Sequence, residues 1–518
     1  MTKLVGVTSE LRINAGSEPR DYQLYTRGKP MYEYQILKDF ERKFSSRYVP
    51  YPQSVRKVGE NLFFITKGKE EKFLVVIGKS FLDKFKGEVF GQIESKKNEV
   101  PLKLCRLKHK NLVNLKEIFP HLFPSPSGIK TSFGTGDRLG IATPAHIRAL
   151  RVHKILPILA QQSVREINRT KRTFQEVMDD AIWGCFQEGY EGIFGADADH
   201  IKKIEDLKKA VDTGYSMFTI DPSDLINDKV PGLSNLKVNK LYQETKERKE
   251  LEKIYKGKVY EIEKNKFFFE DKIFQRIVTT YAKAIKQVIN FYQFLKDYKK
   301  DTFDFEVSID ETSLPTTPLA HIFVTEELHR NGVDFSSLAL RFVGDFQKAI
   351  DYIGDTQKFR KELDLHIKIC KKFGGYKLSL HSGSDKFSIY PIFKERTNGL
   401  FHIKTAGTSW LEAVRVIAKK EPSLFRKLYV VAMNSFERDK FSYHIKTELS
   451  TLPRIEETSN EELETLLNKD NSRQLLHITY GSILNKHRKE IYQTLFKYED
   501  EHYDTVSTHI DKHLCLLD

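Results

Sequence analysis

The sequence predicts a (β/α)8 barrel with an N-terminal α+β accessory region and a C-terminal helical extension. Short apolar segments alternate with helical patterns after about residue 130, and polar residues follow several of these segments. Alternating strands and helices are typical of parallel sheets, and eight such repeats close into a barrel whose site lies at the carboxyl ends of the strands. The candidate strands are 138–143, 155–161, 191–199, 216–221, 303–310, 336–342, 376–381 and 400–404.

The length of the chain, 518 residues, exceeds that of one ordinary domain. The breaker-rich segment 119–128 marks a boundary, and before it the apolar runs 61–66 and 72–77 are expected to pair as a hairpin. The predicted parts are an accessory region at 1–130, the catalytic barrel at 131–420 with an insertion around 222–265, and a helical extension at 421–518.

The formal charge of the chain is +14, from 85 basic and 71 acidic residues. Lysines and glutamates are interleaved, as in 245–258, which is typical of a solvated surface rather than a nucleic-acid site. No run is apolar enough to cross a bilayer, the N-terminus lacks a signal-peptide core, and the four cysteines are scattered. We therefore expect a cytoplasmic protein that binds neither nucleic acid nor membrane, and its charge is compatible with a small anionic substrate. These patterns predict no oligomeric state.

Side-chain parity indicates a charged barrel interior. Strand residues alternate between the interior and the covering helices, and the helix-facing set must be apolar. In 303–310 the apolar set leaves Glu306 inside, and the same argument turns Arg341, His381, His402 and Lys404 inward. Buried charges are costly without partners, so this pattern favours a functional mouth.

Three histidines stand at or near the ends of predicted strands: His200, His381 and His402. Imidazoles that converge beside carboxylates are typical ligands of a divalent metal, whose identity (zinc, manganese, cobalt, nickel or iron) this pattern leaves open. His381 could instead be a core histidine, and His402 could bond only to a neighbour. Asp199, next to His200, would remain available as a base.

Other polar residues are candidates for the second acid/base group and for substrate binding. Glu306 is the first candidate for the acid, although it could be a structural partner of a buried cation, and Asp310 and Glu311 compete with it. The loop after His381 offers small residues and exposed amides for an anion or sugar. The candidate substrate-binding residues are Arg341, Asp385, Lys386 and Lys404.

Long motifs of the chain resemble the tagaturonate epimerase family over about residues 130–420. These motifs are GDRLGIATPAHIRA, LAQQSVREINRT, DDAIWG, GADADH, FTIDPSD, FEVSIDETSLPTTP, LRFVGDFQKAIDY, HSGSDKFSIYP and HIKTAGTSWLEA. The resemblance implies a metal-dependent barrel related to class II aldolases that interconverts D-tagaturonate and D-fructuronate in hexuronate catabolism.

The resemblance also implies roles for individual residues. Asp199 would be the base and His200 a metal ligand, with further ligands at His381 and His402, while Glu306 would be the acid on the opposite face. The expected reaction removes and returns a proton at C3, a carbon next to the ketone, with the metal stabilising an enediolate.

Two alternatives remain at this point. A class II aldolase-like lyase would use the same metal-bound enolate but cleave C3–C4, releasing two three-carbon fragments. A non-catalytic RNA- or sugar-binding barrel would need no stoichiometric metal.

Overall fold

The structure is a computed structural model that describes residues 31–95, 98–299, 302–441 and 443–518. The chain forms two units, Met1–Arg106 and Leu107–Asp518. The division lies upstream of the boundary expected near residue 130. In the part of the chain that the structure describes, no helix combines the length and apolarity needed to span a bilayer.

In the described residues of the first unit, helix α2 packs on an antiparallel sheet in an α+β arrangement. Helix α2 (Met31–Phe44) places Ile36, Leu37 and Phe40 against apolar residues of the sheet such as Leu62 and Val75. The sheet order is β1-β3-β4-β6-β5, with β2 beside β3, and the β3–β4 hairpin confirms the predicted pairing. Its strands are β1 Val49–Pro50, β2 Arg56–Val58, β3 Asn61–Lys67, β4 Lys72–Ile77, β5 Glu88–Ser95 and β6 Asn98–Arg106.

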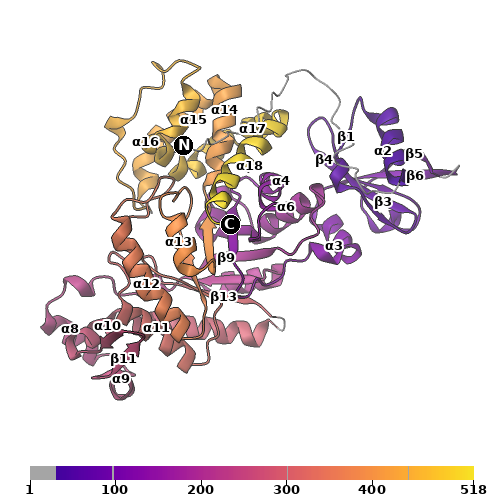
Figure 1. The fold of residues 1–518 in the computed structure, drawn as a ribbon. Helices are drawn as coiled ribbons and strands as arrows, with labels where there is room; N and C mark the ends of the chain where they lie inside the picture. The colour runs from indigo at the N-terminus through magenta and orange to yellow at the C-terminus, as the bar shows by residue number, and fades with distance from the viewer. Residues whose placement is uncertain (1–30, 96–97, 300–301, 442) are drawn as a thin grey trace, which may run out of the picture. The chain divides into compact units, whose positions relative to one another are not determined.

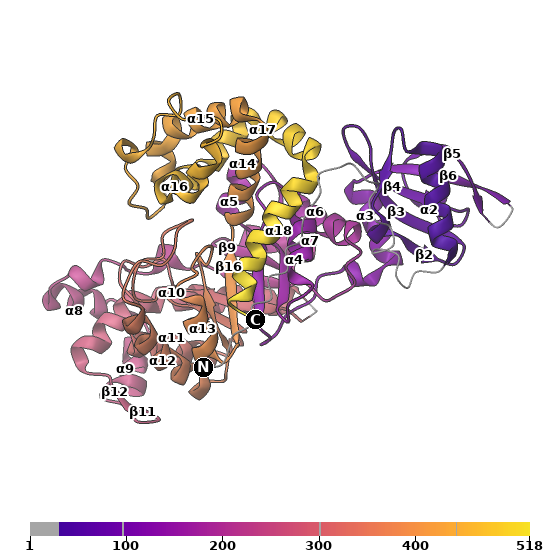
Figure 2. The same cartoon turned by 45° about the horizontal axis from the view of Figure 1, so that its top comes forward.

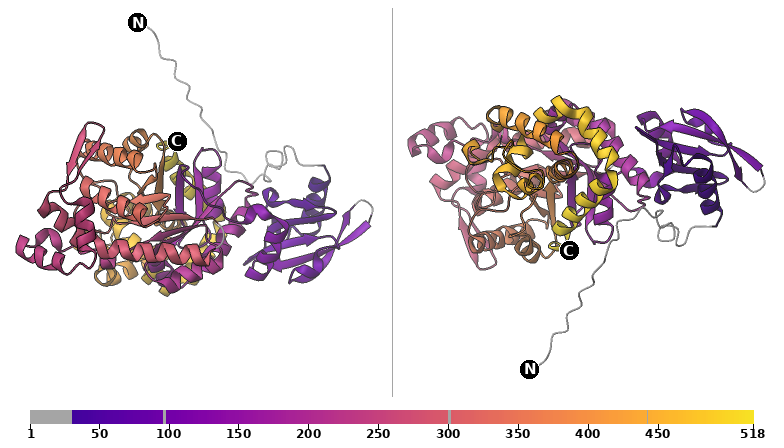
Figure 3. Two further views of the ribbon diagram at one scale, coloured as in Figure 1. Left: turned by 90° about the horizontal axis from the view of Figure 1, so that it is seen from below. Right: turned by 90° about the horizontal axis from the view of Figure 1, so that it is seen from above.

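The second unit contains the predicted closed barrel of parallel strands, in chain order β7-β8-β9-β10-β13-β14-β15-β16, with β16 pairing back to β7. Figure 1 labels two of these strands, β9 and β13. Figure 3 shows helices around these strands from below and from above. The strands are β7 Ser132–Gly136, β8 Leu156–Ser163, β9 Gly195–Ile201, β10 Met217–Ile220, β13 Asp304–Ser308, β14 Ser337–Ala339, β15 Lys377–Leu380 and β16 Phe401–Thr405.

The first barrel strand is not the segment predicted for it. Residues 138–143 form a loop leading into a helix, because the Asp137 carboxylate accepts the N–H groups of Leu139, Gly140 and Ala142 and so replaces sheet pairing. The actual strand, β7, reads SFGTG and lacks an apolar run. A side chain at Gly136 would meet Ala406 Cα at 2.6 Å, so glycine lets the barrel close here.

Helices cover the outside of the barrel between its strands. They are α4 Thr143–Leu150, α5 Val164–Thr170, α6 Phe174–Gln187, α7 Ile204–Thr213, α10 Asp271–Tyr298, α11 Pro318–Arg330, α12 Thr356–Lys372, α13 Tyr390–Thr397 and α14 Thr408–Lys420, preceded by α3 His109–Ile118. The predicted insertion before α10 contains α8 Asn235–Gln243, α9 Arg248–Tyr255 and the hairpin β11 Val259–Ile262 and β12 Asn265–Phe268.

The α-helices described after α14 are α15 Pro422–Lys440, α16 Asp470–Ile478, α17 Tyr480–Lys497 and α18 Glu499–Cys515. Trp410, Leu428 and Leu476 belong to one buried core that joins α14 to this group. Helix α18 runs back beside α4 and α14 (Figure 2). The helical extension therefore packs directly on barrel helices.

A buried cluster of polar residues around Asp304 and Lys377, the plug, lies at the amino-terminal end of the barrel. Asp304, the first residue of β13, accepts from Ser127 N at 2.5 Å, Ser127 Oγ at 2.7 Å and Gly128 N at 2.9 Å. The ammonium of Lys377, the first residue of β15, donates to Ser127 Oγ, Lys130 O and Ser132 Oγ. Polar side chains thus fill a layer that branched apolar residues fill in most barrels.

The plug should make stability pH-dependent through Lys377. Burial lowers the pKa of this ammonium from 10.5 to about 8, although Asp304 opposes the shift. Between those values the unfolded chain holds the proton that the folded protein releases, so the free energy of unfolding should rise with pH. The difference between wild type and Lys377→Met should grow by at most about 1.4 kcal/mol per pH unit in denaturant titrations. The exposed Lys358→Met is the control, and a pH-independent difference for Lys377→Met would contradict the argument.

Candidate active site

A cavity of about 670 Å³ opens at the carboxyl ends of the barrel strands. Its lining comes from loops after several strands and also from the C-terminal helical region, through Tyr443 and His477. The polar lining residues on which the chemistry depends are Arg165, Asp199, His200, Glu311, Lys348 and His381. This is the end of the barrel at which enzymes of this fold act.

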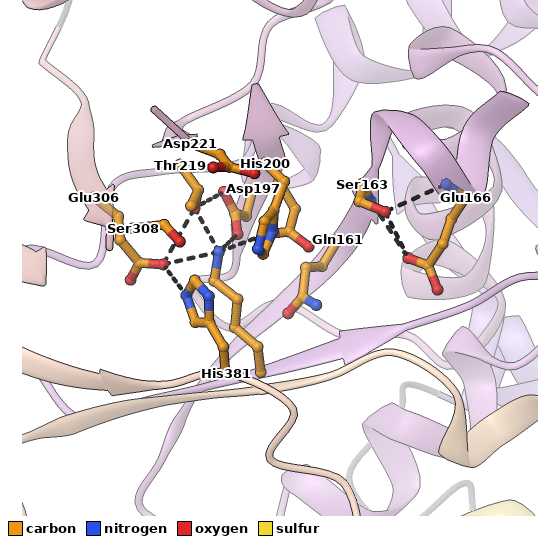
Figure 4. Close-up of polar contacts among 12 residues, drawn as sticks. Gln161, Ser163, Glu166, Asp197, His200, Thr219, Asp221, Glu306, Ser308 and His381 are labelled. Carbon is orange, nitrogen blue, oxygen red and sulfur yellow. Dashed lines mark hydrogen bonds and ion pairs between the residues drawn. The ribbon is translucent and has the colours of Figure 1, made fainter. Parts of the chain in front are cut away.

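One ammonium group lies at the centre of the site. Lys404 Nζ is 2.6 Å from Asp197, 2.7 Å from Asp199 and 2.9 Å from Glu306, and it also donates to Thr219 Oγ1. Figure 4 shows three of these partners, Asp197, Thr219 and Glu306, with His381 beside Glu306. Burial opposes the charge of Lys404, but the three carboxylates outweigh it and raise its pKa well above the ordinary value. Burial and the neighbouring acids raise the pKa of Asp197 to about 6, despite Lys404.

His381 is held between two carboxylates. Its Nε2 donates to Glu306 Oε1 at 2.7 Å, and its Nδ1 is 3.2 Å from Asp310 Oδ1. Burial works against the charged imidazole, but Asp310 and Glu306 together raise its pKa to about 10. Glu306 also accepts from Ser337 Oγ at 2.6 Å. Glu306 is fully buried and is absent from the cavity lining, so it positions His381 from below.

His200 has a similar carboxylate partner. Its Nδ1 donates to Asp199 Oδ1 at 2.7 Å, which leaves Nε2 for another partner. The ring centres of His200 and His381 are 4.9 Å apart, so the two strand-end histidines predicted to converge do so. His200 and Ser382, which follows His381, adopt φ of 54° and 51°. Such strained backbone in residues other than glycine is typical of functional sites.

His200, His381 and Asp310 offer ligand atoms that lie within 4.8 Å of one another. Two imidazole nitrogens and a carboxylate oxygen suit zinc and the other divalent transition metals. Each imidazole already donates its other N–H to a carboxylate, Asp199 or Glu306, which is the arrangement that orients metal-binding histidines. The donor set therefore fits a divalent cation.

Several predicted site residues lie elsewhere. His402 is in the barrel interior, where its Nδ1 is 2.9 Å from Ser132 Oγ, and burial lowers its pKa to about 3; it does not join the His200 cluster. Lys386 donates to the carbonyls of Gln347, Ile350 and Ser384, and is not part of the cavity lining.

Asp385 is also outside the cavity. It pairs with Arg473 at 2.8 Å and with His509 at 2.6 Å, and so ties the loop after β15 to helices α16 and α18. Arg341 does line the cavity, with its guanidinium 6.0 Å from the Phe346 ring centre.

The structure adds residues that the sequence reasoning missed. Arg138 pairs with Glu166 at 2.9 Å and donates to His477 O; it lies in the loop 138–143, for which the sequence predicts a strand. Asp197 was detectable, because the parity rule applied to GADADH turns it to the same side as Asp199. Arg165 lies in the first turn of α5, directly after β8, and Lys348 lies in the loop between β14 and α12.

A (β/α)8 barrel with imidazoles, carboxylates and ammonium groups around a cavity at its carboxyl end defines an enzyme. Comparisons with known proteins specify which kind. A family model described as tagaturonate epimerase matches residues 51–517. A relative from Thermotoga maritima, named tagaturonate/fructuronate epimerase, is 47% identical over 491 residues, covering 93% of this chain and 100% of the relative.

Solved structures agree with this result. Crystal structures of fructuronate-tagaturonate epimerase from Cohnella laeviribosi, native and with one glycerol, match with a TM-score of 0.87 and 39% identity, covering 93% of this chain and 99% of theirs. The chain belongs to the tagaturonate epimerase family and is an isomerase, as the sequence motifs predicted.

Proposed function

We propose that this enzyme interconverts D-tagaturonate and D-fructuronate. The observation that carries the proposal is the joining of Asp199, His200 and His381 at one polar cavity in a chain that is 47% identical to an epimerase of that name. The cavity volume, about 670 Å³, is ample for a six-carbon sugar acid.

The stereochemistry of this pair restricts the mechanism. The two keturonates differ at one carbon. This carbon is C4 when the ketone is numbered C2, and it is C3 when numbering starts at the carboxylate. That carbon is one bond too far from the ketone for the carbonyl to acidify its hydrogen. Direct proton removal next to the ketone, expected from the sequence, would not invert it. Reversible cleavage of the C3–C4 bond would invert C4. The alternative lyase would break the same bond.

The proposed reaction begins with removal of the C4 hydroxyl proton by Asp199. The C3–C4 bond breaks, its electron pair forms the enediolate of the C1–C3 half, and C4 becomes an aldehyde. Rotation about C4–C5 presents the other aldehyde face, C3 attacks it, and the new C4 alkoxide regains a proton. No atom is lost, and the substrate is neither oxidised nor reduced overall.

Two groups on different sides must exchange the hydroxyl proton before and after this rotation. Asp199 uses Oδ1 for His200 and Lys404, and it lines the cavity. Glu311, which the sequence offers as another candidate for the acid, lines the same cavity and makes no hydrogen bond or ion pair with any described residue. We assign Asp199 and Glu311 as the exchanging pair, with Glu306 positioning His381.

His200, His381 and Asp310 are the residues that would hold a divalent cation. When bound, the cation would supply a Lewis acid that polarises the ketone and favours the enediolate. Its binding would displace protons from the imidazoles, because metal ligands must be deprotonated.

Isotope exchange tests the mechanism. D-Tagaturonate incubated with the enzyme in deuterated water should give D-fructuronate without deuterium on the inverted carbon, because its C–H bond never breaks. NMR of the product would measure this. Deuterium on that carbon would contradict bond cleavage, and absence of any D-fructuronate would contradict the proposed function.

A chelator should abolish turnover and zinc or manganese should restore it; full turnover by metal-free enzyme would contradict the metal proposal.

A further inference from the structure

Lys348 is a cation of the cavity that the reaction above does not use. Its half-buried ammonium donates to Ser382 Oγ at 2.6 Å, one residue after His381. Among the described residues no carboxylate lies within 4 Å of it as an ion-pair partner. A half-buried lysine without an ion-pair partner is stabilised when an anion joins it.

Arg165 adds a second positive charge to the same cavity. Its guanidinium lies 4.7 Å from the ring centre of Tyr443, which fixes it by cation–π contact. Burial, together with repulsion by Arg165, lowers the pKa of Lys348, which shows that the two cations share one field.

Of the described acids near these two cations, Glu311 is unpaired and acts on both, whereas three others are engaged by other partners. Glu166 pairs with Arg138 at 2.9 Å, Asp310 with His381 at 3.2 Å, and Asp345 with Lys446 at 3.3 Å. The two cations Lys348 and Arg165 therefore exceed the one unpaired carboxylate described on their side of the cavity, Glu311, whereas the floor around Lys404 carries three carboxylates. A substrate with one anionic end and one polyhydroxylated end would be oriented by this asymmetry.

We propose that Lys348 and Arg165 bind the carboxylate of the substrate, which selects a keturonate over a neutral ketose. The proposal rests on the proposed function and assigns its substrate-orienting residues. Arginine supplies a two-pronged contact to a carboxylate, and lysine supplies a point charge.

The same contact has a second task in the cleavage mechanism. After the C3–C4 bond breaks, the half that carries the carboxylate must turn its aldehyde without leaving. Anchoring at the carboxylate permits rotation about C4–C5 while the fragment stays in the cavity. Loss of the anchor should therefore release three-carbon fragments.

Lys348→Met tests the proposal, because methionine keeps the length of the side chain without its charge. We expect kcat/KM for D-tagaturonate to fall by about 10- to 100-fold, as for loss of a charge-assisted hydrogen bond. Turnover of neutral D-tagatose, and calorimetric binding of this sugar, should change little. Lys348→Arg should recover part of the activity, and Lys358→Met, on the surface of α12, is the matched control. Product analysis should show more three-carbon fragments per turnover for Lys348→Met.

The outcomes separate the two proposals. If wild type converts D-tagaturonate and Lys348→Met keeps the full preference for it over D-tagatose, the anchor is refuted and the function stands. Equal losses for both sugars would also refute the anchor. If wild type does not convert D-tagaturonate, the function fails, and calorimetry then decides the anchor: it is overturned if Lys348→Met binds D-tagaturonate as tightly as wild type.

Discussion

Lys404→Met should abolish turnover and lower the free energy of unfolding by about 3–5 kcal/mol, the usual cost of removing one partner from a buried ion pair. Lys404 is the shared partner of Asp197, Asp199 and Glu306, all of them buried. Without the ammonium these acids repel one another and must bind protons. Denaturant unfolding and a D-tagaturonate assay would measure both effects.

A compensating substitution separates this cause from a simple loss of packing. Asp197→Asn removes one acid, so the pair Lys404→Met and Asp197→Asn should be more stable than Lys404→Met alone. Additive destabilisation of the double variant would contradict the shared-charge argument. Activity should not return, because Lys404 also positions Asp199.

Asp199→Asn should reduce kcat by about 10²- to 10⁴-fold, the usual contribution of a general base. Asparagine keeps the shape of the side chain and an oxygen for His200 and Lys404, but an amide cannot take the hydroxyl proton. Steady-state kinetics, with metal content and circular dichroism as checks of the site and fold, would measure the change.

The exposed Asp334→Asn is the matched control and should behave as wild type. A kcat for Asp199→Asn within about 10-fold of wild type would remove Asp199 from the role of base. Glu311→Gln, made in parallel, tests the second exchanging group assigned above.

Much of the barrel was predictable because the apolar pattern of each strand and helix depends on residues within that element. The apolar runs alternate with helical patterns, and parity within 303–310 and 376–381 turned Glu306 and His381 inward, as their 2.7 Å contact confirms. The same rule brought Lys404 to the interior. The family motifs added what periodicity could not, the kind of reaction.

The remaining misses have physical causes. Apart from Phe133, strand β7 consists of glycine, serine and threonine, because neighbouring segments approach Gly134 and Gly136 too closely for a side chain, so it has no apolar run. Asp385 and Lys386 looked like anion-binding residues, but their partners are Arg473 and backbone carbonyls far along the chain. Sequence patterns do not reveal such distant partners.

The helices after the barrel set a limit on how this enzyme can be reduced or recombined. His477 lies so close to Gly407 that a side chain there would meet its ring at 1.9 Å, and Tyr443 and His477 form part of the cavity wall. A barrel truncated at residue 420 would lose this part of the cavity wall. A chimeric enzyme that takes its barrel from one relative should therefore take its C-terminal helices from the same relative.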